Sequence, residues 1–272
     1  MNKKEILQGK KYNVNSQIYK WYSNELNKMV DKMSDDFYKK VYKLYSKDKE
    51  EIKISQDDSI TSQMRITLNK LKLKYDKYFK YKSKYLVKQF LKKSLKYSFF
   101  TFNNSFKNKD FTIRQKYITE ELKETIKASI YENVNLIKSI NNRYFEEISG
   151  AVYRSINNGK GLNWLKEELL KYKEMTKKRS KLIASDQTHK VYSNIQIKNM
   201  SSNGIKYFKW VHSGGGKNPR EFHKADFPKG LNGGIFSIEN PPVIDKNTGE
   251  KGYPGTLPFC RCSMIPIIKF EN

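Results

Sequence analysis

The chain has 272 residues, and its 54 Lys and Arg against 28 Asp and Glu give a formal net charge of +26. Its two cysteines exclude a disulfide-rich scaffold, and no apolar run approaches the roughly 18 residues that a membrane span needs. The N-terminus, MNKKEILQGKKYNV, lacks the apolar core of a signal peptide. Because 19 Tyr and 15 Phe can supply a core, we expect a folded chain that is made in the cytoplasm and has no membrane partner.

The first part of the chain is predicted to be helical. Neither Gly nor Pro, the residues that interrupt helices, occurs between Gly9 and Gly150. Apolar residues recur every three or four positions, which places them on one helical face. One series comprises Ile18, Tyr22, Leu26, Met29, Met33, Phe37, Val41 and Leu44, and a second runs from Leu122 to Val152. Thr119 is the expected N-cap of the second helix, and polar connections are expected at 47–59 and 103–110.

Residues 65–97 form the most basic segment, with twelve basic residues and a single acidic one, Asp76. One interpretation is a helix that lies along phosphates, with tyrosines available to stack on bases. The alternative is a solvated helix face whose lysine stems cover the core, and we prefer it for this segment taken alone. Under the first interpretation, the nucleic-acid-binding residues are Lys70, Lys72, Lys74, Lys77, Lys80, Lys84, Lys88, Lys92 and Lys93.

The C-terminal part has a different composition. Two further helices are predicted at 157–172 and 177–204, and Gly204 is expected to close the second in the left-handed conformation. All seven prolines lie at or beyond Pro219, in a turn-rich remainder. A strand is predicted at 205–213, with short strands also available within 236–244 and 262–268.

These elements predict an α+β fold in which a long helical N-terminal part precedes a small, loop-rich mixed α/β C-terminal domain. The predicted division is a basic helical region at 1–118 and a second domain at 119–272, helical to about residue 204. Residues 219–272 carry a net charge of only +1, so the excess charge lies in the helical part. Such a chain attracts polyanions, with an affinity that falls as salt rises. A/T-rich codons would also enrich Lys, Asn, Ile and Tyr without selection for any partner.

The less common residue types of the C-terminal part occur in a distinctive order. A strand ends in Trp, an Arg-x-x-His pair follows, and a Gly/Pro-rich loop leads to Cys-Arg-Cys and a nearby Pro. This ordered set resembles the C-terminal domain of the Mu F-like head morphogenesis family of phage minor head proteins. The matching residues are Trp210, Arg220, His223, Cys260, Arg261, Cys262 and Pro266, with Arg179 upstream before the pair Ile183-Ala184. The resemblance covers about residues 120–270.

One step departs from the family pattern. Many relatives continue from Ile-Ala into Thr-Glu, whereas this chain continues into Ser185-Asp186-Gln187. If that Glu anchors the Arg-x-x-His pair in relatives, Asp186 or Gln187 takes its place here.

The resemblance implies a low-copy structural component of the phage head that acts in head morphogenesis. Its implied partners are the portal protein, other head proteins and double-stranded DNA, which it would contact without sequence specificity. Its implied locations are the bacterial host cytoplasm during assembly and then the virion head. We expect no enzymatic activity and no cofactor, with a Zn²⁺ ion as the alternative.

Cys260 and Cys262 admit three interpretations. A disulfide is the least favoured, because residues i and i+2 of an extended segment lie about 6.5–7 Å apart, whereas bridged Cβ atoms lie about 4 Å apart. A Zn²⁺ site ranks second, with His223 as the best third ligand. The other candidate ligands are His189, His212 and Asp226. The favoured interpretation is structural: both thiols point inward as small apolar groups, and Arg261 points the other way.

Two other functions stay open from the sequence. One is a stand-alone basic nucleic-acid-binding protein whose tail is only a stabilising domain. The other is a nuclease in which Arg220, His212 and His223 supply a phosphate clamp, an acid and a base. We favour a structural role for Arg220 and His223, in which they hydrogen-bond loop carbonyls and a carboxylate.

Overall fold

The computed structural model describes residues 6–47, 60–107, 113–115, 117–215 and 219–270. These residues form two compact units, each built from segments that alternate along the chain. The helical unit comprises residues 20–88 and 130–184, and the mixed unit comprises 1–19, 89–129 and 185–272. Most of the predicted connection at 47–59, and part of the one at 103–110, lie outside the described residues. The predicted domain division at residue 118 stays a prediction.

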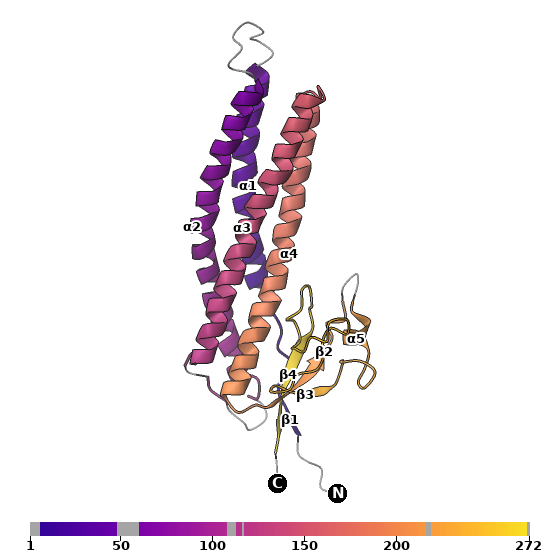
Figure 1. Cartoon of the computed structure of the whole chain (residues 1–272). Coiled ribbons are helices and arrows are strands. Elements are labelled where there is room, and N and C mark those ends of the chain that lie inside the picture. Colours follow the sequence, from indigo (N-terminus) through magenta and orange to yellow (C-terminus); the bar gives the residue numbers. More distant parts are fainter. Residues whose placement is uncertain (1–5, 48–59, 108–112, 116, 216–218, 271–272) are drawn as a thin grey trace. The chain divides into compact units, whose positions relative to one another are not determined.

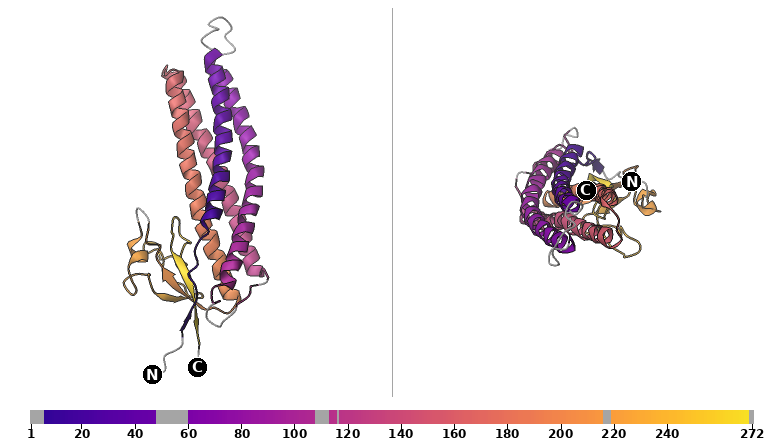
Figure 2. Two further views of the ribbon diagram at one scale, coloured as in Figure 1. Left: turned by 180° about the vertical axis from the view of Figure 1, so that it is seen from behind. Right: turned by 90° about the horizontal axis from the view of Figure 1, so that it is seen from above.

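Four long helices supply the helical unit, and each has residues in both units. They are α1 (Ser16–Lys47), α2 (Ile60–Asn103), α3 (Glu120–Asn157) and α4 (Leu162–Ser202). Within the helical unit, their segments run side by side as a four-helix bundle (Figures 1 and 2). Among the described residues, no helix combines the length and the apolar composition that a membrane crossing requires.

Helix α4 corrects the prediction of two separate helices at 157–172 and 177–204. Neither Gly nor Pro occurs between Gly161 and Gly204, so nothing in the sequence breaks the helix between the two predicted segments. At its end Gly204 has φ 74°, as predicted. The Ile205 N–H donates to the Met200 carbonyl at 3.0 Å and the Gly204 N–H to the Ser201 carbonyl at 3.2 Å. These two bonds are those of a Schellman motif.

Side chains cap the starts of two helices. Thr119 caps α3 as predicted, because its Oγ1 accepts a hydrogen bond from the Leu122 N–H at 3.3 Å. The Oδ1 of Asn15 caps α1 by accepting from Gln17 N at 2.8 Å and Ile18 N at 3.2 Å. Each contact satisfies backbone donors that have no partner inside the helix.

The mixed unit contains a four-stranded sheet in which every neighbouring pair is antiparallel. Its strands are β1 (Ile6–Gln8), β2 (Tyr207–Val211), β3 (Ile235–Ser237) and β4 (Ser263–Lys269), in the order β1-β4-β2-β3. One short helix, α5 (Glu221–Lys224), lies between β2 and β3 in sequence. Figure 2 shows the N-terminal strand β1 beside the C-terminal strand β4.

The sequence predicted three of these strands. Strand β2 lies within the predicted 205–213, and β4 corresponds closely to the predicted 262–268. Within 236–244 only the first two residues belong to β3. Strand β1 was not predicted, because a three-residue segment carries no periodic signal and its partner lies at the other end of the chain.

Pro266 lies inside β4, a strand with neighbours on both sides, where a proline normally removes a ladder bond. Its carbonyl accepts from the Gly9 N–H at 2.9 Å, so it faces the β1 side of the strand. In an antiparallel strand the nitrogen and oxygen of one residue face the same neighbour. The missing N–H of Pro266 therefore faces the segment that follows β1, and the pairing of β4 with β2 loses no donor.

The core of the mixed unit joins helix ends to the sheet and its loops. Phe208 and Trp210 project from alternate positions of β2 and are both 0% exposed. They belong to one cluster with Phe102 of α2, Met200 of α4 and Leu257 of the loop before β4. Helix segments from two distant parts of the sequence therefore complete a core that the small sheet alone does not provide.

The bundle core follows the predicted periodicity. Tyr22, Leu26, Met29, Met33, Phe37 and Val41 of α1 are all at most 1% exposed. Phe37 contacts Tyr144 and Phe145 of α3 edge-on, with ring centroids 6.1 and 5.9 Å apart. Edge-on contacts of this kind add to the free energy gained by burying the rings.

Two polar contacts also lie inside the bundle. The Tyr22 hydroxyl donates to Asn133 Oδ1 at 3.0 Å, and both residues are 0% exposed. Asn141, which interrupts the apolar series of α3, donates through Nδ2 to Asp76 Oδ1 of α2 at 2.6 Å. These bonds satisfy buried polar groups and fix the register between helices.

Helix α2 separates its apolar and basic residues. Leu68, Leu71, Tyr75 and Phe79 are at most 4% exposed. All nine lysines proposed for nucleic-acid binding are exposed, namely Lys70, Lys72, Lys74, Lys77, Lys80, Lys84, Lys88, Lys92 and Lys93. This arrangement agrees with both interpretations of the segment, the solvated face and the phosphate-binding face.

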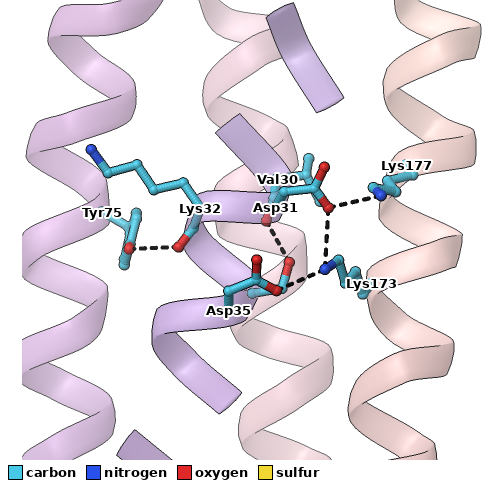
Figure 3. Close-up of polar contacts among 8 residues, drawn as sticks. Val30, Asp31, Lys32, Asp35, Tyr75, Lys173 and Lys177 are labelled. Atoms are coloured by element: carbon cyan, nitrogen blue, oxygen red, sulfur yellow. Dashed lines mark hydrogen bonds and ion pairs between the residues drawn. The ribbon is translucent and has the colours of Figure 1, made fainter. Parts of the chain in front are cut away.

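An ion-pair cluster links α1 to α4 within the helical unit (Figure 3). The Nζ of Lys173 lies 2.7 Å from Asp35 Oδ1 and 3.2 Å from Asp31 Oδ1. The Nζ of Lys177 lies 2.7 Å from Asp31 Oδ1. Burial alone would raise the pKa of Asp31, but hydrogen bonds and charge from Lys177 and Lys173 outweigh it, and the net pKa is lowered. The Asp31 side chain is 37% exposed, so solvent screens the two pairs and their contribution is small.

We expect Asp31→Asn to lower the free energy of unfolding by about 0.5–1 kcal/mol at pH 7 and low salt. Because the pKa of Asp31 is lowered on folding, its contribution is present above the unfolded value of about 3.9 and is lost as the pH falls below it. The difference between wild type and variant should therefore shrink as the pH falls below that value, in urea unfolding followed by circular dichroism. The control is Glu174→Gln, an exposed carboxylate on α4; an equal effect of both variants would contradict a specific pair.

Candidate functional site around the Cys-Arg-Cys segment

Three buried side chains of the mixed unit converge at one point. Cys260 and Cys262 precede β4, and His223 belongs to α5. His223 Nδ1 lies 3.6 Å from Cys260 Sγ and 3.8 Å from Cys262 Sγ. His223 is 2% exposed, Cys260 is 5% exposed and Cys262 is 6% exposed. Within the described part of the chain they form the one group of three or more His, Cys or carboxylate side chains placed to share a metal ion.

The imidazole of His223 is held from both sides. Its Nε2 lies 2.8 Å from the Ile244 carbonyl oxygen, which can only accept, so Nε2 carries the proton. In the neutral imidazole Nδ1 is then the unprotonated nitrogen, and it faces the two sulfurs. Trp210 packs against the ring edge-on, with centroids 5.0 Å apart. These contacts fix both the tautomer and the orientation of the ring.

Backbone conformation aims the cysteines inward. Phe259, directly before Cys260, has φ 59°, which is uncommon for a bulky residue. Its N–H donates to Asp186 Oδ1 of α4 at 2.6 Å, and this bond holds the strained conformation in place. Asp186 therefore anchors the loop before the cysteines, a role that the sequence did not indicate. The sequence had suggested that Asp186 or Gln187 replaces the family's Glu as an anchor of the Arg-x-x-His pair, whereas Asp186 contacts the Phe259 backbone.

The remaining motif residues support the surrounding loops. Arg220 is exposed and donates through Nη2 to the Pro258 carbonyl at 3.2 Å. Arg261 is exposed between two buried cysteines, as predicted, although the segment precedes β4 rather than belonging to it. Arg179 lies in the helical unit, where its Nη2 donates to Ser139 Oγ at 3.1 Å.

The other candidate zinc ligands, His189, His212 and Asp226, contact groups outside the cluster. The Gly214 N–H donates to His212 Nδ1 at 3.1 Å, and His189 donates from Nδ1 to the Ser185 carbonyl at 2.8 Å. Burial lowers the pKa of His189, although its hydrogen bond to Ser185 opposes the shift. Asp226 accepts from Asn232 Nδ2 at 2.8 Å. None of these three belongs to the group around His223 in the described residues.

The two thiols are not equivalent. A hydrogen bond with Cys262 lowers the pKa of Cys260, burial opposes this shift, and the contact with His223 adds to the lowering. The same hydrogen bond with Cys260, together with burial, raises the pKa of Cys262. Both thiols are free, so the disulfide interpretation has no support.

The geometry does not favour the nuclease alternative. An acid or base must reach the substrate within hydrogen-bonding distance. His223 is 2% exposed, with one nitrogen on a carbonyl and the other facing sulfurs, so neither nitrogen is directed at solvent. The arrangement is suited to binding a soft cation or to fixing loops.

The family model for Phage Mu protein F like protein matches residues 146–265. This part of the chain is Mu F-like. The match confirms the resemblance found in the sequence and relates the protein to phage head proteins. A Haemophilus influenzae protein described as uncharacterized is 29% identical over 145 residues, 53% of this chain but only 30% of that relative. No solved structure matches the chain.

The Mu F-like region contains every motif residue except Pro266, which lies directly after it. The sequence identified the cluster members by type and order. It considered Asp186 only as a partner of the Arg-x-x-His pair, and it did not identify the other two groups that position them, the Ile244 carbonyl and Gly255. Of these, only Gly255 carries a sequence signal, since it follows Pro in a turn-rich segment.

Gly255 shapes the loop that leads to Cys260. Its φ is +83°, and an added Cβ would lie 3.3 Å from the Cys262 carbonyl oxygen. We expect Gly255→Ala to destabilise the mixed unit by about 1–2 kcal/mol, the cost of left-handed backbone in a residue with a Cβ. Urea unfolding of the full chain measures this. Gly215→Ala is the control, because nothing lies within 4 Å of its added Cβ; equal stability of the two variants would contradict the prediction.

Proposed function

We propose that the protein is a minor head component that acts in phage head morphogenesis, bound to the portal protein and close to packaged DNA. The Mu F-like region at 146–265 carries the proposal. The burial of its motif residues supports a structural role, because Trp210, His223, Cys260 and Cys262 hold a loop-rich unit together rather than lining an open site.

The basic face of α2 supports contact with DNA. Lys70, Lys77 and Lys84 recur every seven residues and are exposed, so they share one side of the helix. Tyr81 and Tyr85 are 71% and 58% exposed on the same helix. Phosphates bind such lysines without sequence specificity, and the affinity falls steeply with salt as counterions return.

The same lysines favour the second candidate, a stand-alone nucleic-acid-binding protein with no partner in the head. The two candidates differ in protein partners and not in charge. A tagged full-length chain is recovered from phage-producing cells after nuclease treatment and a high-salt wash. The co-purifying proteins are then identified by mass spectrometry.

We expect the portal protein or another head protein to co-purify under these conditions. Nuclease and salt remove partners that are joined only through DNA, so what remains is bound by protein contacts. A tagged, unrelated protein of similar net charge is the control. Recovery of no head protein, or of the same proteins with the control, would replace the head proposal by the stand-alone candidate.

The DNA contact is tested by charge removal on α2. The triple variant Lys70→Gln/Lys77→Gln/Lys84→Gln should weaken binding to non-specific double-stranded DNA. The slope of log K against log salt should fall by about 0.9 for each lost phosphate contact, up to roughly 2.7. Gel-shift or anisotropy titrations between 50 and 200 mM salt, conditions over which such slopes are resolved, provide the measurement.

The matched control is Lys166→Gln/Lys178→Gln/Lys181→Gln, which removes the same charge from exposed positions of α4. A DNA face on α2 predicts a smaller effect for this control. Equal weakening by both triples would indicate that net charge alone drives binding. No binding by the wild type at low salt would remove DNA from the proposed partners.

A further inference from the structure

We propose that His223, Cys260 and Cys262 bind one Zn²⁺ ion, with water in the fourth position. The ion would be structural: it would join α5 to the segment before β4 and thereby fix the loops of the mixed unit. This inference reverses the preference drawn from the sequence, where the cysteines were interpreted first as small apolar groups. It does not depend on the proposed head function.

The spacing of the ligand atoms fits one tetrahedral ion. With Zn–S near 2.3 Å and Zn–N near 2.0–2.1 Å, tetrahedral angles place the nitrogen about 3.5–3.6 Å from each sulfur. The observed separations from His223 Nδ1 are 3.6 Å to Cys260 Sγ and 3.8 Å to Cys262 Sγ. All three ligand atoms lie within 4.8 Å of one another.

The protonation of His223 also suits a metal. A ligating histidine commonly donates its second ring N–H to a carbonyl or carboxylate, which fixes the tautomer. Here Nε2 donates to the Ile244 carbonyl at 2.8 Å, and the lone pair of Nδ1 is directed between two sulfurs.

Charge and burial agree with Zn²⁺. Two thiolates and a neutral imidazole around a divalent cation have no net charge, so burying the occupied site costs little free energy. A set of two sulfurs and one nitrogen favours Zn²⁺ over hard cations such as Mg²⁺ or Ca²⁺. Each thiol that is protonated before binding releases its proton to solvent.

An ion at this place would close a long loop. The chain between His223 and Cys260 spans 37 positions and contains only β3 as regular structure among the described elements. A metal bridge between its ends restricts the unfolded chain and adds binding free energy to folding. The left-handed Gly255 and the strained Phe259 both lie before Cys260, so the fold itself sets the backbone that presents the first cysteine.

The first test uses the untagged wild-type chain, so that no affinity tag binds metal. Elemental analysis of the purified protein should find about one zinc per chain. Removal by 1,10-phenanthroline should lower Tm by on the order of 10 °C, and added Zn²⁺ should restore it. Replacement by Co²⁺ should give the visible and near-ultraviolet absorption of tetrahedral cobalt with thiolate ligands.

Variants locate the site. Cys260→Ser and Cys262→Ser should each reduce bound zinc at least tenfold and abolish the thiolate-to-cobalt absorption. His212→Gln is the control, because His212 lies outside the cluster and its substitution should leave the stoichiometry unchanged. If a cysteine variant does not fold, the wild-type measurements decide alone.

Three results would overturn the proposal. The first is a wild-type chain that contains no zinc and takes up neither Zn²⁺ nor Co²⁺ under reducing conditions. The second is cobalt spectra without thiolate absorption, which would place the metal elsewhere. The third is an equal loss of zinc in His212→Gln and the cysteine variants.

Discussion

The contact of His223 with the two cysteine sulfurs is the constraint on which the mixed unit depends. The sheet is small, with strands of three, five, three and seven residues. The loops between β2 and β4 therefore receive few ladder hydrogen bonds. Their order comes from a few contacts: buried His223 on the Ile244 carbonyl, buried Trp210 on the imidazole, and half-buried Asp186 on the backbone of Phe259. Each group ties a loop to an element outside it.

The helical unit depends on a simpler constraint, the spacing of apolar residues. This is why the sequence predicted it well: Tyr22 to Val41 repeat at helical intervals, and the structure buries all of them. The interruption at Asn141 was equally visible, but its partner Asp76 was not, since helix pairing is decided by packing between distant segments. The continuity of α4 through residues 173–176 was, by contrast, available in the sequence, because Lys173, Glu174 and Met175 favour helix and neither Gly nor Pro interrupts it.

In the candidate site, residue types were predictable and their supports were not. Arg220, His223, Cys260, Arg261 and Cys262 are recognisable by order and spacing. A backbone carbonyl such as that of Ile244 carries no sequence signal, because every residue has one. The left-handed conformation of Phe259 is also invisible, since Phe is not a residue that favours it. The choice between packed thiols and a metal site depends on where Nδ1 points, and only the fold determines that.

The pairing of β1 with β4 has a consequence for the order of folding. Ile6 pairs with Lys269, so the sheet joins a segment that is synthesised early to one that is synthesised much later. The helical unit ends at residue 184 and can form its bundle while synthesis continues. The mixed unit, by contrast, cannot complete its sheet until translation has passed Lys269. Until then Ile6–Gln8 lacks its partner strand β4, and its unpaired backbone groups can pair with other extended segments.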